Sequence, residues 1–194
     1  MKKRRRVVKK RFLLVIVIVL LAMLFLKSDW MNRWLYPIHY QDDIQISAGN
    51  YQLEPHLLAA IIRVETNYSA DAVSKKGAIG IMQLMPDTAE WIVQKGGFTN
   101  VTNESLSSRA DISIEVGSWY LKSLNDQFKD NKYVVIAAYN AGPGKVSRWL
   151  EDGTWDGQLE TVDQIPYGET RHYVQRVIYY YNKYKRLYPD FGAQ

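Results

Sequence analysis

Residues 57–89 read LLAAIIRVETNYSADAVSKKGAIGIMQLMPDTA, and they carry most of the information about the fold. Glu54 and Pro55 precede this stretch, and proline is suited to the first turn of a helix. The apolar residues that follow recur at helical spacing and predict a buried stripe: Leu57, Leu58, Ile61, Ile62 and Val64. Pro86 and Asp87 open a second segment in the same way. The stretch therefore predicts two helices joined by a loop.

Glu65 ends the first of these helices, directly after its apolar stripe. Burial disfavours a carboxylate, and so does the negative end of the helix dipole, so both effects would raise the pKa of Glu65. A carboxylic acid that is still protonated at about pH 6 can donate a proton to a leaving oxygen. The alternative is a solvated glutamate in the last turn of a helix, with no chemical role.

The loop after Glu65 contains two glycines and an isolated amide. Gly77 and Gly80 permit positive φ angles and a close approach of the backbone to a ligand. Gln83 lies among four apolar residues, so its amide is either satisfied in the core or directed at an amide or hydroxyl of a substrate. We expect Lys75 and Lys76 to form a solvated loop tip.

Helical periodicity dominates the rest of the chain, and alternating strand patterns are scarce. Further helices are expected near residues 86–93, 111–124, 133–139, 146–150 and 170–187. In the first of these, Trp91 is expected on the inner face. The class is mainly α, with six to eight helices in a domain at residues 46–188 and a tail at 189–194.

Composition excludes several kinds of site. The 194 residues include no cysteine, which excludes disulfides and thiolate metal sites. His39, His56 and His172 lack ligand spacing, so we expect no metal and no cofactor. Residues 151–157 (EDGTWDG) resemble a loop insertion more than a calcium loop. Tyrosines 179–181 predict core packing and helix surface rather than a stripe for stacking on a ligand.

The net charge of +5 belongs to the N-terminus. Residues 1–27 hold nine of the 25 basic residues and no acid, so 16 basic residues face 20 acidic ones in the remainder. A phosphate-binding surface needs clustered positive charge, which the remainder lacks. We therefore expect no nucleic-acid binding by the folded domain.

Residues 12–26 form an uninterrupted apolar run, FLLVIVIVLLAMLFL, after a basic segment at 1–11. We interpret residues 12–27 as a transmembrane signal-anchor and residues 28–45 as a juxtamembrane stalk. The basic segment predicts that the N-terminus lies in the cytoplasm and that residues 28–194 face outward. A cleaved signal peptide is the alternative, although no small residues mark a cleavage site. A nucleic-acid-binding tail is a third interpretation.

Several segments follow one another in a characteristic order: ETNYSA at 65–70, Ser74, GAIGIMQLMPDTA at 77–89, AYNAG at 138–142 and PYGETRHYV at 166–174. Together they resemble the lytic transglycosylases of the soluble-transglycosylase (SLT) type, a family with a goose-lysozyme-like helical fold. The resemblance covers about residues 46–188. It is strongest toward small membrane-anchored transglycosylases of Gram-positive bacteria.

The resemblance implies that Glu65 is the family's single catalytic acid/base. Thr66 stands where the family usually has serine, so the hydroxyl is kept. Tyr139 matches a tyrosine near the catalytic glutamate, where it would form a hydrogen bond and help to set the proton affinity of that glutamate. The implied substrate-binding residues are Ser74, Gly80, Met82, Gln83, Tyr139, Asn140, Glu169 and Tyr173.

The resemblance also implies a reaction and a substrate. Glu65 would protonate the β-1,4 glycosidic oxygen between N-acetylmuramic acid and N-acetylglucosamine in peptidoglycan glycan strands. It would then take the proton from the muramoyl 6-hydroxyl, which attacks C1 and yields a 1,6-anhydro ring. Two alternatives remain: a hydrolytic muramidase, whose second carboxylate would be sought first at Asp71 and Glu169, and a catalytically weak glycan-binding or assembly protein. Protein partners and the biological occasion are not predicted.

Overall fold

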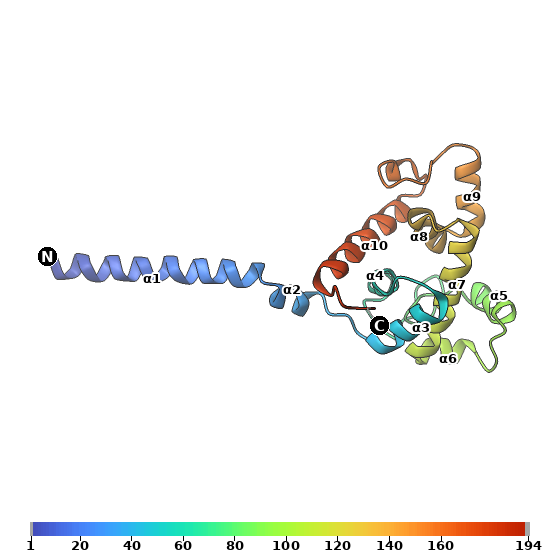
Figure 1. Ribbon diagram of the computed structural model, residues 1–194, viewed down its shortest axis with the longest axis horizontal. Helices are drawn as coiled ribbons and strands as arrows, with labels where there is room; N and C mark the ends of the chain where they lie inside the picture. The colour runs from blue at the N-terminus through green and yellow to red at the C-terminus, as the bar shows by residue number, and fades with distance from the viewer. Residues whose placement is uncertain (1, 193–194) are drawn as a thin grey trace. The chain divides into compact units, whose positions relative to one another are not determined.

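The computed structural model describes residues 2–192, and the chain divides into two compact units, with the boundary after residue 37 (Figure 1). The first unit consists of α1 (Lys2–Lys27) and α2 (Asp29–Leu35). Ser28 caps α2, since its hydroxyl accepts a hydrogen bond from the N–H of Met31 at 3.2 Å. Except for Lys10, the side chains of the predicted basic segment lie outside the described part.

The apolar run at residues 12–26 lies within α1, and its described side chains are exposed. In the described part of the chain, α1 on its own does not meet the length and hydropathy expected of a membrane span. The segments Phe12–Phe25 and Asp29–Leu35 meet those criteria together and are bent by 60° relative to each other.

The second unit is helical, as the sequence predicts. Among residues 38–192 its helices are α3 (Gln41–Tyr51), α4 (Pro55–Glu65), α5 (Pro86–Gly96), α6 (Asn103–Ser108), α7 (Ala110–Gln127), α8 (Lys132–Ala141), α9 (Pro143–Glu151) and α10 (Gly168–Leu187), with a 3₁₀ turn η1 (Val162–Gln164). β-structure in this described range is limited to two isolated bridges, Val73–Ile79 and Ile79–Leu84. The short helix α6 was not predicted.

Helix α4 is the central element of this unit. Five consecutive residues, 58–62, are fully buried, so the helix is enclosed on all sides, which is what a helix without a polar face requires. Helix α10 packs along it, and α3 packs on it as well (Figure 1). Helix α10 also contacts α8, and α7 contacts α3, α5, α6 and α8. The C-terminal end of α4, at Glu65, is thereby fixed by helices from both halves of the unit.

The domain begins earlier than residue 46, the boundary expected from the sequence. The compact unit starts at Ile38, and the expected boundary falls within α3. Asp42 and Asp43 give this stretch the appearance of a polar linker, but they lie in the first turn of α3, whose other face buries Ile44 completely. At the other end, Phe191 is buried within the predicted tail, and residues 193–194 lie outside the described part.

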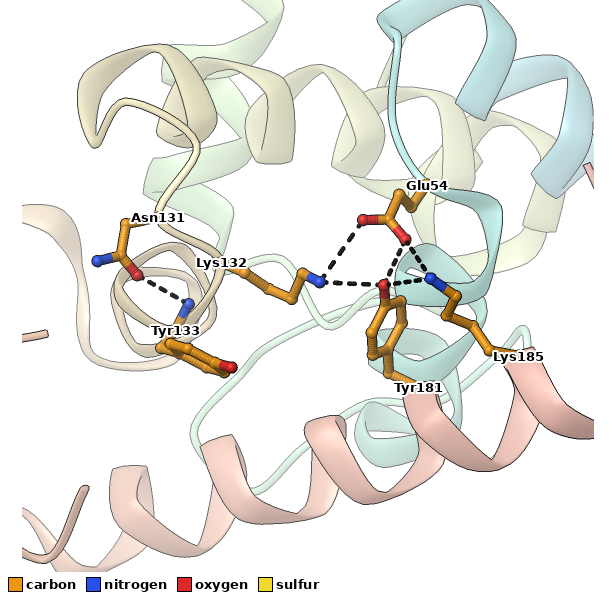
Figure 2. A network of polar contacts seen from close by, with 6 residues as sticks. All are labelled: Glu54, Asn131, Lys132, Tyr133, Tyr181 and Lys185. Carbon is orange, nitrogen blue, oxygen red and sulfur yellow. Dashed lines mark hydrogen bonds and ion pairs between the residues drawn. The ribbon is translucent and has the colours of Figure 1, made fainter. Parts of the chain in front are cut away.

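A cluster of polar side chains joins three helices at their ends remote from Glu65 (Figure 2). Glu54, at the start of α4, accepts a hydrogen bond from the Tyr181 hydroxyl on α10. Lys132, at the start of α8, lies 3.6 Å from the Glu54 carboxylate, and Lys185 lies 3.7 Å from it. Both ammonium groups also donate to the Tyr181 hydroxyl, at 3.0 and 3.2 Å. The cluster, Glu54–Lys132–Tyr181–Lys185, therefore ties α4, α8 and α10 together.

Candidate active site

A cleft of about 520 Å³ lies where the C-terminal ends of α4 and α8 meet the start of α10. The structure brings six of the nine predicted site residues to its lining: Glu65, Ser74, Gln83, Tyr139, Asn140 and Glu169. These residues come from three helices and from the loop between α4 and α5, so the cleft exists only in the folded tertiary structure.

Glu65 lines the cleft with a carboxyl group that is largely enclosed by protein. Burial raises its pKa to about 7. The hydrogen bond from Tyr173 and the positive charge of Arg176 act against this rise, and the negative charge of Glu169 adds to it. A carboxyl group with this pKa exchanges its proton near neutral pH, as a general acid that later acts as a base requires.

Tyrosines 173 and 139 have different partners. The Tyr173 hydroxyl donates to Glu65 Oε1 at 2.6 Å, whereas the Tyr139 hydroxyl donates to the carbonyl oxygen of Met82 at 2.8 Å. The sequence had suggested Tyr139 for the hydrogen bond that sets the proton affinity of Glu65. In the structure Tyr173 supplies it, because α10 packs along α4 and brings residue 173 beside residue 65. Burial raises the pKa of both phenols well above their usual value, so both hydroxyls stay neutral donors.

The loop between α4 and α5 is held by its own polar groups. Thr66 donates to the carbonyl oxygen of Ile81 at 2.9 Å, so the hydroxyl kept at this position fastens the loop to the end of α4. The Gln83 amide donates to the carbonyl oxygens of Ala72 and Gly80, at 3.1 and 2.9 Å. The Ser74 hydroxyl accepts from the N–H of Ala78 at 2.9 Å. Ser74 and Gln83 therefore shape the cleft wall as well as line it.

Gly80, Met82 and Tyr173 do not line the cleft, although the sequence placed them among the substrate-binding residues. Gly80 has a φ angle of +72°, and a Cβ atom there would lie 2.0 Å from the carbonyl oxygen of Leu106. Met82 is fully buried and would meet any Cβ added at Gly117. Gly80 and Met82 therefore shape the cleft without lining it. Gly80 allows the loop to pack closely against residue 106, and the carbonyl oxygen of Met82 accepts the hydrogen bond from Tyr139.

Two further polar contacts join the cleft walls. The Asn140 side-chain oxygen accepts from the Thr170 hydroxyl at 2.8 Å, which links the end of α8 to α10. Lys76 lies 3.2 Å from Glu169, with 78% and 72% of the two side chains exposed. Such an exposed ion pair contributes little to stability, so it can separate without disturbing the fold. Lys76 thus lines the cleft opposite Glu169, where the sequence suggested only a loop tip.

The two carboxylates considered for a hydrolytic role, Asp71 and Glu169, lie differently relative to the cleft. Glu169 lines the cleft together with Glu65, whereas Asp71 accepts a hydrogen bond from the Ser69 hydroxyl at 2.9 Å and is not part of the cleft lining. In the part of the chain that the structure describes, no group of three or more His, Cys, Asp or Glu side chains could hold a metal ion. Sequence reasoning missed the lining residues Thr88 and Tyr120, which lie on helices whose relative placement only the fold reveals.

The helical fold and the enclosed glutamate define a class that comparison with known proteins identifies directly. The model of the transglycosylase SLT domain matches residues 42–160, and the chain belongs to this family. This confirms the family resemblance and the helical fold class.

Among curated relatives, the soluble lytic murein transglycosylase of Escherichia coli (strain K12) is 32% identical over 80% of this chain and 24% of the relative. The membrane-bound lytic murein transglycosylase C of Actinobacillus pleuropneumoniae is 27% identical over 72% of this chain and 44% of the relative. The chain thus spans a quarter to a half of the length of these relatives.

A solved structure of the lytic transglycosylase Slt from Pseudomonas aeruginosa, an inactive mutant with glutamine in place of a glutamate, superposes with a TM-score of 0.70. It is 35% identical and covers 78% of this chain and 24% of that one.

Proposed function

We propose that this chain is a membrane-anchored lytic transglycosylase that cleaves the β-1,4 bond between N-acetylmuramic acid and N-acetylglucosamine in peptidoglycan. The observation that carries the proposal is Glu65, a cleft carboxyl group with a pKa raised to about 7 and a hydrogen bond from Tyr173 at 2.6 Å. Relatives named lytic murein transglycosylases support the substrate class. The inactive glutamate-to-glutamine mutant of the Pseudomonas protein supports the importance of such a glutamate in this family.

The protonated carboxyl group of Glu65 donates its proton to the glycosidic oxygen as the bond to C1 breaks. The muramoyl acetamido group assists at C1. The Glu65 carboxylate then accepts the proton of the muramoyl 6-hydroxyl, whose oxygen forms the new bond to C1 and closes the 1,6-anhydro ring. Because this nucleophile belongs to the same sugar, its high effective concentration removes the need for a second carboxylate to activate water.

Product analysis tests the reaction. The full-length protein, purified in detergent, is incubated with purified peptidoglycan, and the soluble muropeptides are analysed by mass spectrometry. Transglycosylation gives anhydromuramoyl ends about 18 Da lighter than the reducing ends that hydrolysis gives, since no water is added across the cleaved bond. Reducing ends would favour the muramidase alternative. Binding without any product would favour the glycan-binding alternative.

Two substitutions separate the carboxylates. Glu65→Gln keeps the size of the side chain but has no proton to transfer, so we expect turnover to fall by at least about 10²-fold, the lower end of a general acid's contribution. Asp71→Asn is the matched control, because Asp71 is exposed and does not line the cleft. Wild-type turnover by the Glu65→Gln variant would remove the basis of the proposal.

The proposed anchor is the N-terminal unit. Its support is the apolar exposed segment Phe12–Phe25, which meets the criteria for a membrane span together with Asp29–Leu35, and the membrane-bound relative from Actinobacillus. The N-terminus would lie in the cytoplasm and the catalytic unit on the wall side. The test compares membrane fractionation of the full chain with that of a chain lacking residues 1–27. Protease added to intact protoplasts should digest the catalytic unit and spare an N-terminal tag. Release of the full chain from membranes by salt alone would argue against a spanning anchor.

A further inference from the structure

A second pocket adjoins the active-site cleft along α5 and α7. It has a volume of about 330 Å³, and Thr88 and Tyr120 line both cavities. The backbone joins them again, because Gly142 lines the cleft and Pro143, the next residue, lines the second pocket. We name it the α5–α7 pocket, and the residues that matter here are Asp87, Thr88, Trp91, Tyr120, Ser123 and Gln127.

Trp91 presents an aromatic surface to this pocket. Its side chain is 44% exposed, whereas the sequence had suggested an inward position. Helix α5 closes the core with Ala89 and Ile92, which lie on another face, so the core does not require the indole. Two rings hold it edge-on: Trp119 at 5.8 Å and Tyr120 at 6.3 Å between ring centroids. A partly exposed aromatic ring that is fixed in orientation offers a flat apolar face to a ligand, with its N–H available as a polar group.

A row of aromatic rings connects this surface to the catalytic centre. The Tyr120 ring lies 5.5 Å from the Tyr139 ring, and Tyr139 lines the cleft together with Glu65. Trp91, Tyr120 and Tyr139 therefore follow one another from the α5–α7 pocket into the cleft. Because Thr88 and Tyr120 line both cavities, an extended ligand bound next to Glu65 would pass these two residues to reach Trp91.

The polar side chains around Trp91 indicate which class of ligand the pocket can bind. Asp87 offers a carboxylate, Ser123 a hydroxyl and Gln127 an amide, all lining the same pocket. A pyranose has apolar C–H faces that suit an aromatic ring, and hydroxyl and acetamido groups that need hydrogen-bond partners at its rim. A pocket with an aromatic face and a few polar groups offers both.

We propose that the α5–α7 pocket binds an additional sugar of the glycan strand, beyond the sugars held in the cleft beside Glu65, with Trp91 as the stacking surface. The inference rests on the proposed function, because the glycan strand is the ligand. Binding remote from the cleaved bond benefits only substrates long enough to reach it. The pocket therefore gives the protein a preference for longer glycan strands.

Chain-length dependence tests this inference. In the full-length protein, kcat/KM is measured on peptidoglycan glycans of two and of four disaccharide units. We expect Trp91→Ala to lower kcat/KM on the longer glycan by roughly three- to tenfold, the range that one aromatic contact supplies. The shorter glycan should be cleaved as by the wild type. Trp91→Tyr should restore most of the lost activity. Tyr179→Ala is the control, because Tyr179 is 50% exposed on α10 and lies outside both cavities.

A binding measurement separates failure of the pocket from failure of the reaction. In a Glu65→Gln background, calorimetry compares the affinity for N-acetylglucosamine oligomers of two and of six sugars, with and without Trp91→Ala. A loss confined to the longer oligomer supports the subsite even if turnover proves to follow another chemistry. An equal loss on both lengths would mean that Trp91 only supports the fold. An unchanged affinity for the longer oligomer would also overturn the proposal.

Discussion

Replacing Tyr173 with phenylalanine removes one hydroxyl group, and that hydroxyl donates to Glu65 Oε1 at 2.6 Å. The hydrogen bond favours the charged carboxylate and so lowers the pKa of Glu65, against the larger effect of burial that brings it to about 7. Without the hydroxyl, burial acts with less opposition. The pKa of Glu65 should therefore rise further.

The size of this rise follows from the strength of the bond. A hydrogen bond to a charged group contributes about 1.5–3 kcal/mol, and a change of one pH unit in a pKa corresponds to about 1.4 kcal/mol. The hydroxyl also bonds to the neutral acid, so only part of that energy distinguishes the two protonation states. We expect the pKa of Glu65 to rise by roughly one pH unit, to about 8.

The assay is the pH dependence of turnover, followed as the loss of turbidity of suspended peptidoglycan between about pH 5 and pH 9. Glu65 must carry its proton to donate it, so the rate falls as the pH rises through its pKa. In Tyr173→Phe the fall should come at higher pH, whatever happens to the maximal rate. Tyr139→Phe is the control, because its hydroxyl donates to Met82 and not to Glu65. A basic limb that stays in place or moves to lower pH would refute the reasoning.

Three more predictions concern stability. In the folded protein Glu65 keeps its proton up to about pH 7, whereas in the unfolded chain it loses the proton near pH 4.5, so the free energy of unfolding falls as the pH rises through this window. Glu65→Gln has no such proton and should remove up to about 3 kcal/mol of that fall. The measurement is urea unfolding of both proteins at pH 5 and at pH 8. Gly80→Ala should lower the free energy of unfolding by more than about 3 kcal/mol and the Tm with it, because its Cβ would lie 2.0 Å from the Leu106 carbonyl oxygen; an unchanged Tm would contradict that geometry. Lys76→Ala, which removes the exposed pair with Glu169, should change stability by less than about 0.5 kcal/mol, and a larger loss in the same unfolding assay would show that the pair holds the cleft walls together.

The sequence was sufficient for the elements whose evidence is local. Apolar spacing and Pro55 predict α4. The position of Glu65 at its end leaves a raised pKa and a solvated carboxylate both open, and the structure has the buried carboxyl group with the raised pKa. Family motifs then bring Ser74, Gln83, Tyr139, Asn140 and Glu169 to the same cleft, where the structure has them.

What the sequence did not provide depends on how helices pack. The hydrogen bond from Tyr173 to Glu65 joins residues 108 positions apart, and only the docking of α10 on α4 determines which tyrosine reaches the carboxylate. The sequence places the first five residues of α3, 41–45, in the stalk because the first turn of this helix is acidic. The prediction that Trp91 lies on the inner face of α5 is wrong for a different reason. The position of Trp91 two residues after Ala89 is about 200° around the helix, so periodicity alone could have placed it outward.

The order in which the helices are made has a consequence for the cell. Protein synthesis completes α4 well before α8 and α10, yet the raised pKa of Glu65 depends on burial that includes α10, and its hydroxyl partner lies on that helix. In a chain that still lacks α10, the carboxyl group of Glu65 would be more exposed to water, so its pKa would lie nearer the usual value for glutamate. If the proposed reaction is correct, the protein becomes active only when α10 has folded against α4. On that proposal, a chain that has not finished folding would not cleave peptidoglycan.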